Sequence, residues 1–422
     1  MKKSFLLSFL LLGILVSYQN CGKAVALKNE STSEASVENG YYIVVSDSNT
    51  PEPSTQVIDI APYNDETFLA VARKAIQSYE SQVTWKSFMK IFHAEASVAV
   101  SCGAVITSNT TVSGTLDCSN YTGDYGLIIY GNNVTFDGGS TKFKLIFPQG
   151  KVGILAYGNN VEVKNTEVNG VTNGMGILLY DSENGKVRGN KTNNNLIGIT
   201  AYAENVTMNQ VVVTGNISQN NSLFGIRVNS AWSNNKKVSS PTINNNDLSS
   251  NQHYALHVRT DNLNFDGSNN VNILTGSTNG WYLTGGTFSF QNMNINSNST
   301  TVTKTQIFVA EANNISLSSV QLSGSGGNSA QEAYGLHAYK ANNVIVNNCG
   351  FQNYNVGVKV ATEGGANSNI NVSAGSITNN TFAAIMIQGY DNTQLCPNIN
   401  NVYYANNSVF NLWRVSGGNF CN

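Results

Sequence analysis

The sequence predicts an all-β solenoid, a fold in which the chain winds into stacked coils of short strands. Similar phrases such as "GILAYGNNVEV", "GILLYDSENGKV" and "GLHAYKANNVIV" recur along the chain. A repeat period of 20 to 50 residues is typical of stacked architectures. Each copy holds short alternating strands and no helical pattern, so we expect coils made of strands. The copies begin at positions 126, 153, 176, 198, 225, 255, 280, 306, 335, 357 and 384.

The composition supports a folded protein and excludes several function classes. Of the 422 residues, 41% are hydrophobic and their spacing is periodic, which opposes disorder despite the abundance of Asn and Gly. Only 11% are charged and the net charge is −2. We therefore expect no nucleic-acid partner and no polybasic membrane surface.

Residues 1–21 predict a targeting segment. Lys2 and Lys3 precede an apolar stretch that is too short to span a bilayer and ends at "SYQNCG". This end resembles a bacterial lipoprotein signal, in which Cys21 becomes the lipidated first residue; the alternative is an ordinary secretory signal. We expect an exported protein, a cell-surface or outer-membrane lipoprotein that meets the membrane through its lipid anchor only. The alternative location is secreted or periplasmic.

Three further segments follow the signal. Residues 22–60 are rich in Ser, Glu and Thr and predict a flexible tether. Residues 61–99 predict a helical cap, with one helix over 64–82 and a second amphipathic piece over 83–93, placed over the open N-terminal end of the coils. Residues 100–422 form the solenoid. The expected apolar face of the first helix comprises Phe68, Val71, Ala75, Ile76 and Tyr79.

An exported chain permits disulfides. Cys102 and Cys118 flank a pair of short strands and are the expected bridge, and Cys396 with Cys421 is a second candidate pair. Cys349 is then left as a buried thiol. The spacing of Cys and His predicts no zinc site and no other metal.

The alternation within each copy predicts which side chains point inward. Residues one and three positions after ten of the starts are all apolar. They are Ile154, Ala156, Ile177, Leu179, Ile199, Ala201, Ile226, Val228, Leu256, Val258, Trp281, Leu283, Ile307, Val309, Leu336, Ala338, Val358, Val360, Ile385 and Ile387.

Asn recurs after the first strand, where a tight corner needs left-handed backbone angles. Stacked Asn side chains can also hydrogen-bond from coil to coil. The candidates for this ladder are Asn133, Asn160, Asn205, Asn262, Asn314 and Asn343.

Residues 100–420 resemble the pectate-lyase-like superfamily. The opening "CGAVITSNTTVSGTLDC", followed by "GLIIYGNNVTFDGG", is similar to the way many secreted members of that class begin. The resemblance implies a right-handed parallel β-helix of about 11–12 coils. It implies no particular activity, because this fold carries lyases, hydrolases, epimerases, adhesins and phage spikes.

Residues two and four positions after each start are expected on the outer surface, in two zones. The first zone is a ladder of Tyr130, Tyr157, Tyr180 and Tyr202, which either packs along the coils or forms a docking surface for a partner or the N-terminal segment. The second zone, here called the stripe, spans roughly 24 Å at a coil spacing of about 4.8 Å. Its residues are Arg227, His257, Arg259, Tyr282, Phe308, His337, Tyr339 and Lys359.

The stripe predicts binding of an anionic polysaccharide, a cell-surface glycan or a surface protein. Aromatic faces would stack on sugar rings, and cations would pair with carboxylates or sulfates. The competing interpretations are a solvated sheet face or a face covered by the loops at 230–250 and 267–280.

The catalytic alternative is a polysaccharide lyase or epimerase, favoured over a glycoside hydrolase because a hydrolase needs a pair of carboxylates and the outer columns contain none. The acids lie at corners instead, Asp181 and Glu204 among them. His257 with Arg259, or His337 with Lys359, would then be base and enolate stabiliser. Ca²⁺ is a cofactor only in that case. The two histidines are about 14 Å apart on the coil spacing and cannot share a metal. A purely structural envelope protein is the remaining possibility.

Overall fold

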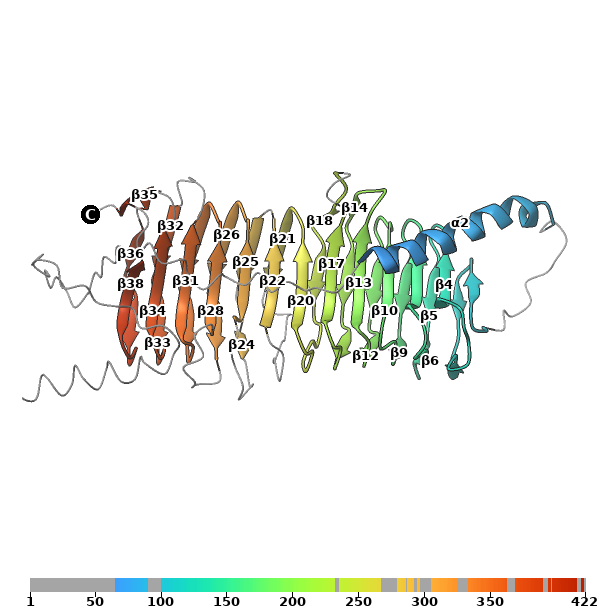
Figure 1. The fold of residues 1–422 in the computed structure, drawn as a ribbon, viewed down its shortest axis with the longest axis horizontal. Helices are drawn as coiled ribbons and strands as arrows, with labels where there is room; N and C mark the ends of the chain where they lie inside the picture. Colours follow the sequence, from blue (N-terminus) through green and yellow to red (C-terminus); the bar gives the residue numbers. More distant parts are fainter. Residues whose placement is uncertain are drawn as a thin grey trace, which may run out of the picture. The chain divides into compact units, whose positions relative to one another are not determined.

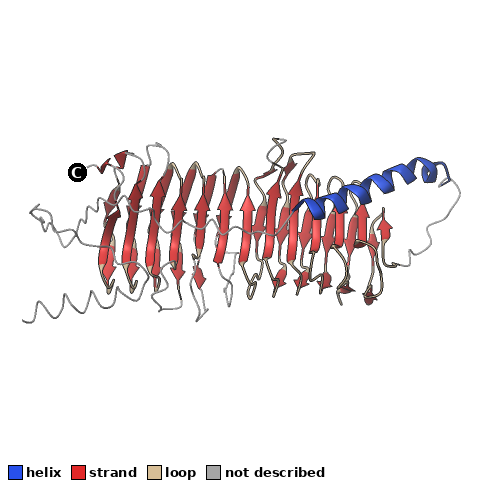
Figure 2. Cartoon of the chain, viewed as in Figure 1, coloured by secondary structure: helices blue, strands red, loops and turns tan. Residues whose placement is uncertain are grey.

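The computed structural model describes residues 65–89, 100–231, 235–266, 279–285, 287–291, 294–296, 305–324, 333–362, 369–389, 394–395, 397–415 and 419–420. These residues form a parallel β-solenoid with one helix, so the predicted fold class is confirmed (Figures 1 and 2). The chain divides into two units, Met1–Gly40 and Tyr41–Asn422. The signal segment with Cys21, the tether 22–60, Cys396 and Cys421 lie outside the described residues.

One large parallel sheet runs the length of the solenoid with one strand from each coil. Each of the eleven predicted starts marks one of its strands, and β1 and β38 add one strand at either end. The thirteen strands in spatial order are β1 (Ala104–Ile106), β4 (Tyr125–Tyr130), β7 (Val152–Tyr157), β10 (Met175–Tyr180), β13 (Ile197–Ala203), β17 (Phe224–Ser230), β20 (Tyr254–Arg259), β22 (Asn279–Thr284), β25 (Ile307–Ala310), β28 (Tyr334–Tyr339), β31 (Val356–Thr362), β34 (Ala383–Gly389) and β38 (Phe410–Val415).

Shorter parallel sheets form the other sides of the coils. The second side has two six-stranded sheets: β2 (Thr110–Thr111), β5 (Thr135–Asp137), β8 (Glu162–Lys164), β11 (Lys186–Arg188), β15 (Val212–Thr214) and β19 (Thr242–Asn244); then β21 (Asn262–Asp266), β23 (Thr287–Gln291), β26 (Asn314–Ser318), β29 (Asn343–Asn347), β32 (Asn369–Ser373) and β36 (Asn398–Asn400). The third side has two five-stranded sheets: β3 (Thr115–Asp117), β6 (Phe143–Ile146), β9 (Thr166–Asn169), β12 (Lys191–Asn193) and β16 (Ile217–Gln219); then β24 (Asn294–Asn296), β27 (Gln321–Ser323), β30 (Gly350–Gln352), β33 (Ser376–Thr378) and β37 (Tyr403–Ala405). Two further pairs are β14 (Met208–Asn209) with β18 (Val238–Ser239), and β35 (Gln394–Leu395) with β39 (Asn419–Phe420).

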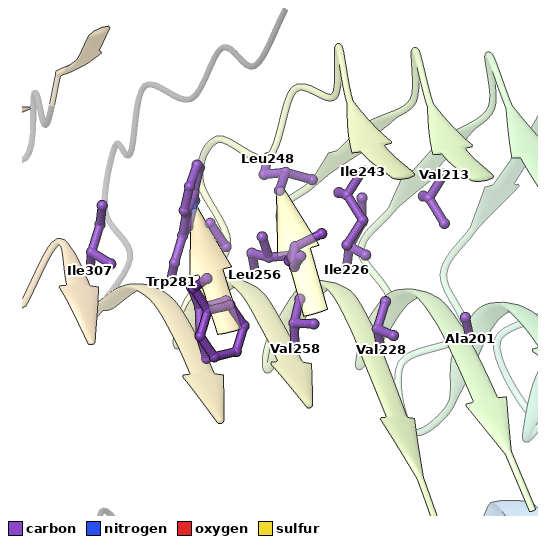
Figure 3. Packing of buried hydrophobic residues seen from close by; sticks show 14 of the residues in the cluster. Ala201, Val213, Ile226, Val228, Ile243, Leu248, Leu256, Val258, Trp281 and Ile307 are labelled. Atoms are coloured by element: carbon purple, nitrogen blue, oxygen red, sulfur yellow. The ribbon is translucent and has the colours of Figure 1, made fainter. Parts of the chain in front are cut away.

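The interior of the coils is a continuous apolar core. All the residues predicted to point inward from the large sheet are at most 1% exposed and belong to one cluster. Figure 3 shows Ile226, Leu256 and Trp281 packed together in this interior. Because each apolar residue is stacked on a counterpart one coil away, burial is repeated along the axis and stabilises every coil in the same way.

The Asn ladder at the corners is confirmed in part. Asn133 and Asn160 have positive φ angles of 60° and 54°, and the Asn160 side chain donates a 2.8 Å hydrogen bond to the Asn133 side-chain oxygen. Asn343 donates a bond of the same length to Asn314. Asn205 departs from the prediction, because its amide binds a carboxylate of the neighbouring coil instead of another Asn.

Two buried Asn ladders were not predicted. In the first, the Asn190 side chain donates to Asn216 at 3.1 Å, and the Asn216 side chain donates to Asn246 at 3.0 Å. The second joins Asn221 to Asn251 at 2.9 Å in the same way. The signal was present in the sequence, since each ladder places Asn one coil apart at the end of a strand. Such side chains satisfy the backbone groups of tight corners that no water reaches.

The disulfide Cys102–Cys118 is confirmed, and it closes the first coil. Cys349 is a buried free thiol, as predicted. Burial raises the pKa of this thiol to about 11, so it is an inert core residue at neutral pH.

The N-terminal helix α2 (Asp65–Met89) is a single helix, so the two pieces predicted over 64–93 are largely one element. Its buried face differs from the prediction: Leu69 and Ala72 replace Val71, which is partly exposed. The predicted position over the open end of the coils also needs correction. The buried side chains of α2 pack against the outer face of the large sheet, along β4, β7, β10 and β13 (Figure 1). These side chains are Phe68, Leu69, Ala72, Ala75 and Ile76.

Candidate functional site

The outer face of the large sheet carries the residues that the sequence singles out. The backbone register pairs Arg227 with His257, His257 with Tyr282, and Tyr282 with Phe308. The same column continues through His337 to Lys359 on the next two coils. The structure therefore brings the predicted stripe together as one vertical row, with Arg259 and Tyr339 in the neighbouring row.

The Tyr ladder is both a packing device and a docking surface. Tyr130 stacks on Tyr157 with ring centroids 5.6 Å apart, and Tyr157 contacts Tyr180 at 6.2 Å. Tyr79 of α2 lies 4.6 Å from the Tyr130 ring. The sequence left both interpretations open, and the structure shows that the chain's own helix covers the ladder.

An ion-pair cluster attaches α2 to the sheet. The Arg73 guanidinium donates to both oxygens of Glu204 at 2.9 Å from its Nε, and it also bonds Glu66 on its own helix. The hydroxyl of Tyr180 donates to the same Glu204 carboxylate. Hydrogen bonds from Glu66 and Glu204 raise the pKa of Arg73, and burial, followed by Glu204, raises the pKa of Tyr180. Glu204 is therefore a helix anchor and not only a corner residue.

Asp181 holds the neighbouring corner. Its carboxylate accepts the backbone N–H of Glu204 at 2.6 Å and that of Asn205 at 3.0 Å, and it also accepts the Asn205 side chain. Asp181 and Glu204 are both buried. Because both carboxylates are used in these bonds, they do not form the open acid pair that glycoside hydrolysis requires.

The rings of the stripe stack on one another. His257 lies between Phe224 and Tyr282, with centroid distances of 5.1 and 5.0 Å. Tyr282 in turn stacks on Phe308 at 5.2 Å with an interplanar angle of 9°, and Phe308 contacts His337 at 4.9 Å. The coil spacing of about 4.8 Å matches the spacing of stacked rings. The faces of these rings are therefore occupied, and only their edges can meet a ligand.

Two cations lie against these rings. Arg227 donates from its Nε to Nδ1 of His257 at 3.3 Å and stands 5.6 Å from the Phe224 centroid. The Lys359 ammonium stands 5.0 Å from the centroid of Tyr334. Cation–π contacts of this kind compensate part of the cost of desolvating a charge.

The stripe is half covered. Arg259, Tyr282, Phe308 and Tyr339 are partly exposed. The remaining four residues are buried, with exposed fractions of 5% for Arg227, 8% for His257, 4% for His337 and 5% for Lys359. The outcome lies between the two predictions of an open binding strip and a covered face.

Burial controls the charge state of both histidines. It lowers the pKa of His257 well below its ordinary value of 6.5, and the nearby Arg227 and Arg259 lower it further. Burial followed by Lys359 lowers the pKa of His337 in the same direction. Both rings are neutral at pH 7 and are weak bases, which opposes the role of general base in a lyase. The described residues contain no cluster of metal-ligating side chains.

The stability of the protein is expected to fall as the pH drops below about 6.5. The unfolded chain takes up these two protons near that pH, whereas the folded chain takes them up only at lower pH. The stabilisation is complete above the unfolded pKa and is lost toward the folded one. Urea unfolding midpoints measured from about pH 8 to about pH 5 should show this decline, and His257→Gln should reduce it. His253→Gln is the control, because His253 is exposed; equal slopes in both variants would contradict the assignment.

No family model matches the chain, and no curated protein or solved structure is significantly similar to it. The fold therefore defines the class, a parallel β-solenoid, and the site must be interpreted from its own residues. Within the described part of the chain, no helix is long and apolar enough to cross a membrane.

Proposed function

We propose that this protein is an exported, lipid-anchored β-helix that binds an anionic glycan along the stripe without catalysis. The observation that carries the proposal is the vertical row of the large sheet, where aromatic and cationic side chains follow one another on successive coils. The partly exposed residues of that row and its neighbour are the contact points. They are Arg259, Tyr282, Phe308 and Tyr339.

Recognition uses the edges of these side chains. Since the faces of Tyr282 and Phe308 are stacked on their neighbours, sugar rings cannot stack there. The Arg259 guanidinium instead pairs with carboxylate or sulfate groups, and the Tyr282 hydroxyl offers a hydrogen bond. A strand spacing of about 4.8 Å is close to the length of one sugar unit, so that a linear polymer meets an equivalent position on each coil.

The absence of catalysis is proposed from the state of the acids and bases. Both histidines are neutral weak bases, and the carboxylates of Asp181 and Glu204 are engaged in structural bonds. The resemblance to pectate-lyase-like proteins concerns the fold, which is compatible with binding proteins as well as enzymes. Export and lipidation are proposed from the charged and apolar segments before Cys21.

The test is binding of sulfated and uronate-containing polysaccharides to the soluble protein. We expect the dissociation constant to rise about tenfold in Arg259→Ala, as for the loss of one charge-assisted bond pair. Arg188→Ala is the control, because Arg188 is 44% exposed on β11 of another sheet and pairs with Glu162 at 3.5 Å. Binding of no anionic polymer, or equal weakening in both variants, would refute the proposal.

A further inference from the structure

We propose that residues 41–64, directly before α2, continue along the outer face of the large sheet and cover the stripe. The chain would then carry its own occupant for the proposed glycan site. The cover itself is independent of the proposed function, and only its effect on glycan binding depends on that function.

The direction of α2 places this segment on the stripe. Arg73 bonds Glu204 beyond β13, whereas Tyr79, less than two turns later, stacks on Tyr130 of β4. The helix therefore runs from later coils toward earlier ones, and its first residue, Asp65, faces the coils of the stripe. The apolar cluster beneath the helix already extends to Tyr254 and Tyr282, which lie on β20 and β22. The preceding residues reach the sheet exactly at the edge of an interface that is already formed.

The segment is long enough for this path. The stripe spans roughly 24 Å, five steps of about 4.8 Å. An extended chain reaches about 3.3 Å per residue, so the stretch from 41 to 64 can cover it with residues to spare. The division of the chain also begins its second unit at Tyr41, the first residue of this stretch.

The burial of the stripe is unlike that of the other outer faces. Lysines that point outward from the shorter sheets keep much of their exposure, 34% for Lys164 and 37% for Lys191. Lys359 is only 5% exposed, although it also points away from the core. His337 is 4% exposed, and its Nε2 has no hydrogen-bond partner within the described chain. A covering segment accounts for the burial and offers that nitrogen a partner.

The chemistry of residues 41–64 complements the stripe. The segment contains the apolar runs "YYIVV" and "VIDI", the acids Asp47, Glu52 and Asp59, and no Lys or Arg. These acids can pair with the cations of the stripe, and the apolar residues can pack on the ring edges. Three prolines oppose pairing as an added strand, so the segment is suited to lying across the face of the sheet.

Hydrogen exchange of the full chain, followed by mass spectrometry, tests the cover. We expect amides of residues 41–64 to exchange at least about tenfold more slowly than those of 22–40. The triple variant Asp47→Lys, Glu52→Lys, Asp59→Lys should remove this protection by reversing the charges. Glu30→Lys, Glu34→Lys, Glu38→Lys is the control, with the same charge change in residues 22–40, and should leave protection intact. Equal exchange of the two segments in the unmodified chain would overturn the proposal.

Polysaccharide binding by the same variants separates the two proposals. If both are correct, the Asp47, Glu52, Asp59 variant binds anionic polymers more tightly than the unmodified protein, because a competitor has been displaced. Protection of residues 41–64 together with no polysaccharide binding would support the cover and refute the glycan function alone. Glycan binding with unprotected residues 41–64 would have the opposite meaning.

Discussion

Replacing Asn216 with Ala is expected to destabilise the coils around β15 and β16 by about 2–5 kcal/mol. The Asn216 side-chain oxygen accepts the backbone N–H of Asn190 at 2.9 Å, and its amide donates to the carbonyl of Val187 at 3.0 Å. All these groups lie in the buried ladder, where no water can replace a lost partner. The substitution leaves two buried backbone groups unpaired, and each costs about 1–3 kcal/mol.

Asn343→Ala is the matched control. Asn343 also bonds an Asn of the next coil, at 2.8 Å to Asn314, but its side chain is partly exposed. Water can satisfy the groups left behind, so the expected loss is below about 1 kcal/mol. Urea unfolding combined with hydrogen exchange of the affected coils measures both values, since coils in a solenoid unfold partly independently. Similar losses in both variants would show that burial does not set the strength of the ladder.

The coil pattern of this protein was predictable because it is local and repeated. Alternation along each strand determines whether a side chain points in or out, and the period aligns Ile226 with Leu256 and Arg227 with His257. Even the buried Asn ladders follow the same period. Ten successive coils gave consistent evidence, so a single irregular copy could not displace the register.

What covers the outer face was not predictable in the same way. The bond from Arg73 to Glu204 joins residues 131 positions apart, and no repeat relates the helix to the coils. The burial of Lys359 likewise depends on what lies above the sheet and not on its place in the strand. The sequence therefore predicts the stripe as a row of residues, whereas its accessibility is a property of the tertiary structure.

Replacing Ala72 with Glu is expected to detach α2 from the sheet. Ala72 is fully buried in the cluster between the helix and the large sheet. A carboxylate placed there has no cationic partner in this apolar cluster, and burying it costs about 3 kcal/mol or more. The helix can avoid that cost by leaving the sheet, which exposes Ile128, Leu155 and Leu178 beneath it. Large exposed apolar patches promote association, so we also expect the variant to aggregate.

Gln77→Glu provides the comparison, because it introduces the same side chain at an exposed position of the same helix. Hydrogen exchange should show loss of protection over Asp65–Met89 in Ala72→Glu, unchanged protection in Gln77→Glu, and intact coils in both. The coils should persist because their core lies on the other side of the sheet and includes none of the helix residues. If α2 stayed protected in Ala72→Glu, its attachment would depend on the Arg73–Glu204 cluster rather than on the apolar face, and Arg73→Ala would then be the variant that releases it.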